Sequence, residues 1–428
     1  MHGIRSRRVI IPLVFLIMML FGGLDGLRGV SIPAVRADLS VSYNVLGLTL
    51  FGSTLAFIAA IYAAGAVARN RGLKTVLVLG LLLTAVSHTV APFAVHIAVY
   101  AVMLTVLQFG GGWLEVGLNA VGAEVFTRRA AVGMSLLHLF FGLGSTVFSR
   151  LGGGLIESST GWRGAYFGAL VVTVPLLLWT LVSSFPRHGV DEDNGDEDRI
   201  DKDNANNGSA EGDSIVKDSH GAVSGQPHIL RELKDPFVRW IALLLGAVIM
   251  VEIGIGSWLA NFLVTQAGFG EATAGTWLAL FWALFTLGRL ICPFFAEHFG
   301  YKRTVALFSI AIMAAFAAGI TMPSIPVFLS LTGLFVSIMY PTVMAILMAR
   351  YPGRAGRLMS PVLIVAVSLA NLSNWVFAAM HDVLGEYWGF AAIGLTPLLI
   401  LGALYAVAVS ARTPAQSFSS SSRSDSSG

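Results

Sequence analysis

Residues 9–31 read VIIPLVFLIMMLFGGLDGLRGVS, an apolar run that holds a single acid, Asp25, and a single base, Arg28. A helix of about 20 apolar residues is long enough to cross the ~30 Å hydrocarbon core of a bilayer. Runs of similar length recur along the chain, separated by short polar breaks. We place these further runs near residues 44–67, 75–94, 97–123, 131–154, 164–185, 238–264, 273–296, 303–321, 325–348, 357–380 and 387–409. The sequence therefore predicts twelve transmembrane helices.

The composition agrees with a chain that is embedded in a lipid bilayer. Hydrophobic residues make up 55% of the sequence, charged residues only 12%, and the mean hydropathy is +0.76. A soluble domain carries about 25% charged residues, so this chain lacks the polar side chains that would cover a water-facing surface. The 47 glycines suit membrane helices, because small residues let helix backbones approach closely.

The first apolar run also has features of a secretory signal peptide, since Arg5, Arg7 and Arg8 precede it. It lacks a small-x-small cleavage site, however, and Asp25 and Arg28 follow where cleavage would be expected. We therefore expect this run to be retained as the first transmembrane helix.

Cys292 is the single cysteine, which excludes an intrachain disulfide and a thiolate metal site. The sequence contains no nucleotide-binding motif, metal-ligand cluster or nucleophile–base arrangement. A primary pump would need an ATP-binding domain, and no polar stretch is long enough to fold one. We expect a protein that is not an enzyme and that uses no cofactor or metal.

The charges divide the chain into two halves. Of the 24 acids, 13 lie in residues 187–235, which leaves 11 acids against 21 Lys and Arg elsewhere. The pI near 9.1 therefore reflects bases at the ends of apolar runs, and it does not indicate nucleic-acid binding. Segment 187–235 has too few apolar residues to fold, so we expect a disordered cytoplasmic linker. It would join one six-helix bundle in 1–186 to another in 236–411, followed by a disordered Ser-rich tail in 412–428.

The loops between the predicted spans alternate between basic and nearly uncharged. In the nearly uncharged set, the loop between spans 3 and 4 holds His96, the loop between spans 7 and 8 holds Glu271, and the loop between spans 9 and 10 holds no charge. The basic residues are Arg5, Arg7 and Arg8 before the first span, Arg69, Arg71, Lys74, Arg128 and Arg129 in the first half, and Lys302, Arg303, Arg350, Arg354 and Arg357 in the second. Because Lys and Arg concentrate on the cytoplasmic side of membrane proteins, we expect a multi-pass protein of the cell membrane with both termini in the cytoplasm.

Two loops at matching places in the two halves have similar sequences. Residues 65–74 read GAVARNRGLK, and residues 288–303 read GRLICPFFAEHFGYKR. Both resemble the loop signature of the major facilitator superfamily. The resemblance implies an all-α fold of twelve transmembrane helices in two pseudo-symmetric six-helix bundles, and secondary transport by alternating access.

In that superfamily the acid of the loop signature pairs with nearby bases and helix ends, and it stabilises the outward-open state. The first copy has Arg69 in place of this acid. The resemblance therefore does not imply the same stabilising pair in the first half. The second copy keeps an acid, Glu297, and the resemblance implies a conformational lock formed with Arg289, Lys302 and Arg303.

Four further segments resemble the fucose–galactose–glucose:proton symporter branch of the superfamily. They are GLDG at 23–26, LEVGLN at 114–119, LHLFFGLG at 137–144 and EIGIGSW at 252–258. Three residues depart from the branch: Asn371 and Asn374 stand in a span that is usually glycine-rich, and Arg150 stands where proline is common. The resemblance implies a hexose-like substrate, a coupled proton and no cofactor.

Asp25, Glu115 and Glu252 lie well inside predicted spans. An ionisable group near the middle of a bilayer costs at least about 2.5–3.5 kcal/mol on insertion scales, so each needs a reason to be there. The three acids belong to spans 1, 4 and 7, each the first helix of a three-helix repeat. Such helices line the central cavity of this architecture, so we expect one shared site near the midplane.

Pairs of polar residues at helical spacing accompany two of these acids. Arg28 lies three residues after Asp25, and Asn119 lies four after Glu115, so each pair shares a helix face. Asp25 and Arg28 could take part in proton coupling or form a static ion pair. The resemblance implies that Glu115 carries the proton and Asn119 binds hydroxyl groups; the alternative is a structural hydrogen bond between helices.

A sugar site combines an aromatic face with amide or carboxylate groups. The candidates for substrate binding are Asn119, Glu252, Trp258, Asn261, Trp113, Asn371 and Asn374. His138 is a possible proton relay, because histidine changes charge near neutral pH. A membrane Trp is often an interface anchor, however, and a membrane Asn or His often packs between helices.

We therefore predict a proton symporter for a small hexose-like sugar that works in the bilayer as a monomer. Two alternatives remain open. A proton-driven exporter of lipophilic compounds shares the loop signature and would have an aromatic pocket without sugar preference. A receptor built on a transporter fold would bind its ligand without moving it.

Overall fold

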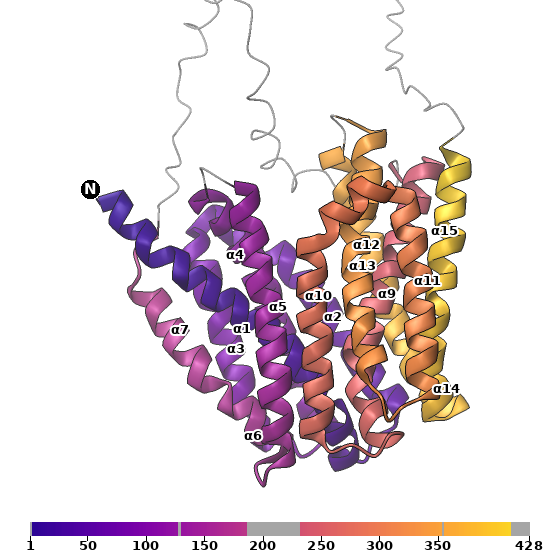
Figure 1. The fold of residues 1–428 in the computed structure, drawn as a ribbon. Coiled ribbons are helices and arrows are strands. Elements are labelled where there is room, and N and C mark those ends of the chain that lie inside the picture. Colours follow the sequence, from indigo (N-terminus) through magenta and orange to yellow (C-terminus); the bar gives the residue numbers. More distant parts are fainter. Residues whose placement is uncertain (1, 127–129, 186–231, 353–354, 412–428) are drawn as a thin grey trace, which may run out of the picture.

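The computed structural model describes residues 2–126, 130–185, 232–352 and 355–411 (Figure 1). Every regular element in these residues is a helix. Twelve spans among them are long and apolar enough to cross a membrane, which confirms the predicted class. Some spans are longer than the apolar runs suggest; the first covers Val9–Leu39 where the sequence predicts 9–31.

The first six spans form an amino-terminal bundle. α1 packs on α5, and α4 packs on both α2 and α3. The helices are α1 (His2–Leu39), α2 (Tyr43–Arg71), α3 (Leu73–Val90) with the 3₁₀ turn η1 (Ala91–Phe93), α4 (Ile97–Val125), α5 (Ala130–Glu157), α6 (Gly161–Gly168) and α7 (Leu170–Val182). α6 and α7 together make the sixth span.

The last six spans form the carboxy-terminal bundle, in which α9 packs on α13 and α10 on α12. The helices are α9 (Pro236–Thr265), α10 (Glu271–Phe299), α11 (Tyr301–Thr321), α12 (Val327–Arg350), α13 (Ala355–Leu384), α14 (Glu386–Ala391), the 3₁₀ turn η4 (Ala392–Leu395) and α15 (Thr396–Ser410). The last three elements make the twelfth span.

The predicted linker mostly lies outside the described residues, as does the predicted tail 412–428. Its last residue, Asp235, belongs to the fold. The Asp235 carboxylate accepts a hydrogen bond from the Phe237 amide at 2.9 Å, and Pro236 occupies the first turn of α9. An acidic cap followed by proline is a strong helix start.

Equivalent turns of the two halves are built alike. α2 ends at Gly72 and α10 ends at Gly300, with φ of 82° and 79°. Glycine adopts this left-handed region without the steric cost that a Cβ brings, so it ends a helix tightly. These turns and both described chain ends lie at one end of the molecule, which we call the basic face (Figure 1). The opposite face carries the turns at 40–42, 266–270 and Gly385.

The two bundles meet along three helix pairs, α5 with α10, α2 with α13 and α1 with α9. Glycines allow the α5–α10 contact, which Figure 1 shows at the centre of the molecule. A Cβ added to Gly153 would lie 2.6 Å from the Glu271 carbonyl oxygen and 3.1 Å from the Cα of Gly275. The small residues therefore bring the two backbones together, as in other membrane helix pairs.

Candidate functional site

Asp25 and Arg28 form an ion pair near the middle of α1. An Arg28 guanidinium nitrogen lies 2.8 Å from Asp25 Oδ1, so the contact predicted from their spacing is present. The side chains remain 30% and 23% exposed, respectively. The pair is therefore reachable although it lies deep within a span.

Glu115 and Asn119 lie side by side on α4. The Asn119 amide donates to Glu115 Oε1 at 2.9 Å and to the Glu115 carbonyl oxygen at 2.8 Å. Both side chains are partly exposed, and Glu115 interacts electrostatically with Asp25 on α1. The acids of the first and fourth spans thus face the same space.

Glu252 on α9 completes this group from the other bundle. It interacts electrostatically with Asp25 and with Arg289 on α10. Arg289 also interacts with His138 on α5 and with Tyr340 on α12. We call Asp25, Arg28, Glu115, Asn119, His138, Glu252, Arg289 and Tyr340 the central cluster. The structure thus brings together the three acids for which the sequence predicts a shared site.

The position of Arg289 corrects the interpretation that paired it with Glu297. Eight residues of α-helix span about 12 Å, so the two side chains cannot meet on a regular α10. The Arg289 guanidinium instead stacks over the Phe285 ring at 4.5 Å. Glu297, Lys302 and Arg303 are exposed at the basic face, where a lock without Arg289 stays a prediction.

Four of the predicted sugar-binding residues lie elsewhere, where the bundles join; Trp258, Asn261 and Asn374 are buried, and Asn371 is partly exposed. The Trp258 indole N–H donates to Asn374 Oδ1 at 2.8 Å, and the Asn261 amide donates to the Tyr43 hydroxyl at 3.1 Å. Asn371 accepts a hydrogen bond from Thr54 at 3.0 Å across the same interface. In this conformation these side chains hold α9 and α13 against α2.

Trp113 does not reach the central cluster. It packs with Ala60, Ala64 and Val76 inside the amino-terminal bundle, between α2, α3 and α4. Two residues of an α-helix correspond to a rotation of about 200°, so Trp113 points away from the face that carries Glu115. The prediction that it binds substrate is not supported by this position.

The sequence analysis missed the polar groups that join the bundles at the opposite face. Arg36 forms an ion pair with Glu386 at 2.9 Å, and its guanidinium lies 4.0 Å above the Tyr43 ring. The Tyr43 hydroxyl donates to Glu386 Oε1 at 2.7 Å. We call Arg36, Tyr43, Asn261, Asp382 and Glu386 the opposite-face seam.

Two carboxylates cap helices of the other bundle. Asp382 at the end of α13 accepts from the amides of Tyr43 at 3.0 Å and Asn44 at 2.7 Å, which begin α2. Glu157 at the end of α5 accepts from the Ala272 amide at the start of α10, at 2.7 Å. Each acid ends the fifth span of its half. The position of each acid at the end of a fifth span could be recognised in the sequence. The partners of these acids could not, because they are backbone amides, which no side-chain pattern reveals.

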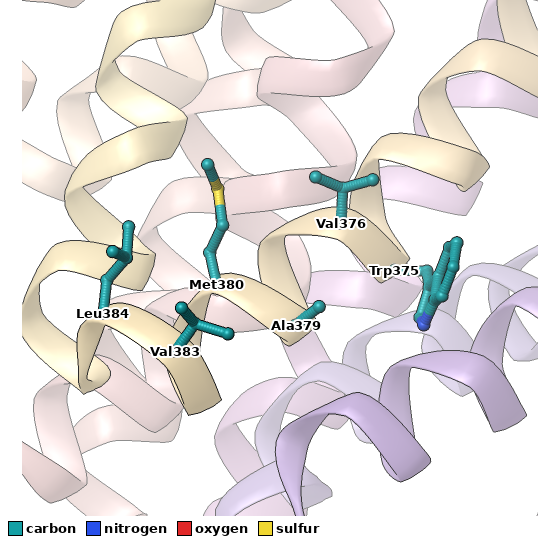
Figure 2. Close-up of a pocket in the computed structure, with 6 residues that line it drawn as sticks. All are labelled: Trp375, Val376, Ala379, Met380, Val383 and Leu384. Atoms are coloured by element: carbon teal, nitrogen blue, oxygen red, sulfur yellow. The ribbon is translucent and has the colours of Figure 1, made fainter.

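A groove of about 290 Å³ lies on α13, and Figure 2 shows the side chains that line it. Its lining is apolar except for the Trp375 indole, whose N–H already donates to Asn44 Oδ1 at 2.8 Å. A polar solute would find no hydrogen-bonding groups there. The central cluster is therefore the candidate site.

The sequence matches the Major Facilitator Superfamily profile over residues 14–370. This chain belongs to the Major Facilitator Superfamily. As a member of this superfamily it is an integral membrane transporter. A curated relative from Streptomyces coelicolor, the probable actinorhodin transporter, is 29% identical over 164 residues. That alignment covers 36% of this chain and only about a quarter, 28%, of the relative.

Solved structures of superfamily members share the fold over nearly the whole chain. The D-xylose-proton symporter is 14% identical, with a TM-score of 0.70 over 93% of this chain and 96% of that one. The nucleoside transporter NupG is 14% identical, with a TM-score of 0.71 over 95% and 99%. FucP in the outward conformation is 16% identical, with a TM-score of 0.57 over 95% and 99%. At these identities the likeness concerns the fold alone.

Proposed function

We propose that this transporter moves a small polar, hexose-like solute by proton symport, with Glu115 as the group that carries the proton. The observation that carries the proposal is the Glu115–Asn119 hydrogen bond in the middle of α4. The carboxyl group and the amide are partly exposed, as is the Asp25–Arg28 pair, and Glu115 lies within electrostatic range of Asp25. A carboxyl group deep in a span is costly unless it has a function.

The chemistry of the cluster favours a solute with hydroxyl groups. Asn119 offers an amide, and Tyr340 offers a hydroxyl next to the carboxyl groups. The D-xylose-proton symporter and FucP, a fucose:proton symporter, share this fold. One chain supplies every group in this proposal, so a monomer suffices.

The contacts between the bundles also indicate which state of the transport cycle this conformation represents. The bundles are joined at the opposite face by the Arg36–Glu386 ion pair and by the caps at Asp382 and Glu157. If the basic face lies in the cytoplasm, as the loop charges predict, this is a state closed to the outside. Breaking the opposite-face seam and rocking the bundles would expose the central cluster to the other side.

The test uses purified protein in proteoliposomes and a labelled hexose. Wild type should accumulate the sugar when an inward proton gradient is imposed. Glu115→Gln should reach only equilibration, while exchange of labelled for unlabelled sugar persists, because Gln resembles a protonated carboxyl group. Glu124→Gln, at the end of the same helix, is the matched control and should accumulate like wild type. Gradient-driven accumulation by Glu115→Gln would rule out the coupling role.

A second function is favoured by the curated relative. The probable actinorhodin transporter suggests that this chain could instead export lipophilic compounds with proton exchange. In inside-out vesicles, an exporter would take up a lipophilic dye when the lumen is acidified, and it would show no hexose exchange. Hexose exchange without dye uptake would exclude this alternative.

A further inference from the structure

Arg289 is a cation without a direct counter-ion. It lies ten residues before the end of α10 at Phe299, and its side chain is partly exposed. Among the described residues, no carboxylate oxygen comes within the 4.0 Å of an ion pair to its guanidinium. The Arg289 guanidinium lies 4.5 Å from the centroid of the Phe285 ring. An intramembrane cation of this kind needs a reason to be there.

Arg28, the other base of the central cluster, differs from Arg289. Arg28 meets its carboxylate at 2.8 Å, three residues away on one helix. Arg289 and Glu252 interact electrostatically from neighbouring helices but do not meet. Arg28 is thus neutralised within the chain, whereas the donors of Arg289 stay free. A guanidinium presents its donors in a planar fork that matches a carboxylate.

Two buried aromatic side chains precede Arg289 on α10. Phe285 and Trp282 precede it on α10, and their rings lie in edge contact, with centroids 5.5 Å apart. Trp282 packs over Gly256 on α9, where an added Cβ would lie 3.0 Å from the indole. The buried Trp282 indole N–H has no hydrogen-bond partner among the described residues. Phe285 and Trp282 are buried, so of these three side chains only that of Arg289 is partly exposed.

We propose that the transported solute carries a carboxylate, as a sugar acid does, and that Arg289 is its anchor. This rests on the proposed function and narrows its substrate class. The carboxylate would bind the partly exposed Arg289 guanidinium. Arg289 is therefore the residue that distinguishes an acidic sugar from a neutral one.

Glu252 makes anion binding and proton binding depend on each other. An ionised Glu252 would repel the carboxylate, and a protonated one would not, so each ligand strengthens the binding of the other. The other charged or titratable groups that face this space are Asp25 and Arg28 on α1, Glu115 on α4, His138 on α5 and Tyr340 on α12.

The experiment compares exchange of a labelled hexuronate with exchange of the matching hexose in proteoliposomes. Wild type should exchange the hexuronate better. Arg289→Gln should lower the hexuronate-to-hexose ratio roughly 10- to 100-fold, the loss of a charge-assisted hydrogen bond, and Arg289→Lys should lie between. Arg239→Gln, an exposed base on α9, is the matched control and should keep the wild-type ratio.

Each result has one meaning. Hexose exchange without hexuronate exchange would be consistent with the proposed function but would contradict the carboxylate anchor. A hexuronate-to-hexose ratio that is unchanged in Arg289→Gln would have the same two consequences. Preference for a hexose phosphate over the hexuronate also overturns it. Exchange of no sugar overturns the proposed function as well.

Should Arg289→Gln not fold, the test is the thermal stability of detergent-purified wild type. Stabilisation by the hexuronate but not by the hexose would support the carboxylate anchor, and the absence of this difference would overturn it. That stabilisation should grow as pH falls, and Glu252→Gln should weaken the pH dependence, of which Glu115 supplies the rest.

Discussion

Asp25 and Arg28 show how far a single residue's role follows from its spacing. Three residues of helix bring their side chains to 2.8 Å, as the spacing predicts. The contact does not say whether the pair is static or is broken during transport. These two interpretations differ in what should happen when both charges are removed together.

We expect Asp25→Asn to destabilise the protein, because it leaves Arg28 without its counter-ion. A fully buried broken pair costs about 3–5 kcal/mol, and the cost here should be smaller because both side chains are partly exposed. The double variant Asp25→Asn/Arg28→Gln should recover the melting temperature in detergent but not proton-driven uptake. Recovery of both would show that the pair is only structural.

At the scale of helices, the two inter-bundle caps are related by the internal symmetry of the fold. α13 caps α2 through Asp382, and α5 caps α10 through Glu157. In each case the last turn of a fifth span meets the first turn of a second span of the other half. A carboxylate at a helix start accepts hydrogen bonds from free amides and interacts favourably with the helix dipole. These contacts break when the bundles separate at the opposite face, so they stabilise the closed arrangement.

Removing both caps with Asp382→Ala and Glu157→Ala should shift the protein towards the state that is open at the opposite face. A cap is worth about 0.5–2 kcal/mol, and both acids are exposed, so we expect roughly a fivefold shift. Spin labels at Val95 and Ile325, in turns of different bundles, would report a longer distance in a Cys292→Ser background.

Asp38→Ala is the matched control for the caps. Asp38 lies at the same face, but its partners Arg163 and Trp162, at 2.7 Å and 3.0 Å, belong to its own bundle. Its replacement should leave the distance distribution unchanged. An equal shift in Asp38→Ala would mean that loss of any acid at this face, and not loss of the caps, opens the bundles.

For the whole molecule, we expect the orientation in the membrane to follow from the charge of the loops. The turns at the basic face carry the Lys and Arg residues, and positive loops remain in the cytoplasm. The structure adds that both described chain ends lie at that face (Figure 1). The opposite-face seam would then control access from outside the cell.

Cysteines introduced in a Cys292→Ser background should test this orientation in intact cells. Val95→Cys and Ile325→Cys at the opposite face should react with a membrane-impermeant maleimide. Tyr301→Cys, exposed at the basic face, should react only after permeabilisation. The reverse pattern would invert the proposed direction of access and contradict the loop-charge rule for this chain.

Much of the fold could be predicted, because each span is encoded locally. Hydropathy marked twelve helices, and Gly72 and Gly300 marked equivalent helix ends.

The candidate site could be predicted only in part. Asp25, Glu115 and Glu252 meet because they lie on equivalent helices, but Trp113 was misplaced because its position around α4 was not considered. Asp382 was missed because its partners are backbone amides of Tyr43 and Asn44, far away in sequence.

The sequence by itself determined the membrane class, the number of spans and the pairs at helical spacing, because bilayer thickness and helix geometry act within one segment. Only the tertiary structure decided which of these groups share a space. It placed Arg289 beside Glu252 rather than Glu297, and it assigned Trp258 and Asn261 to the closed interface. The physical reason is that contacts between bundles depend on how separate helices pack and tilt, which no single segment encodes.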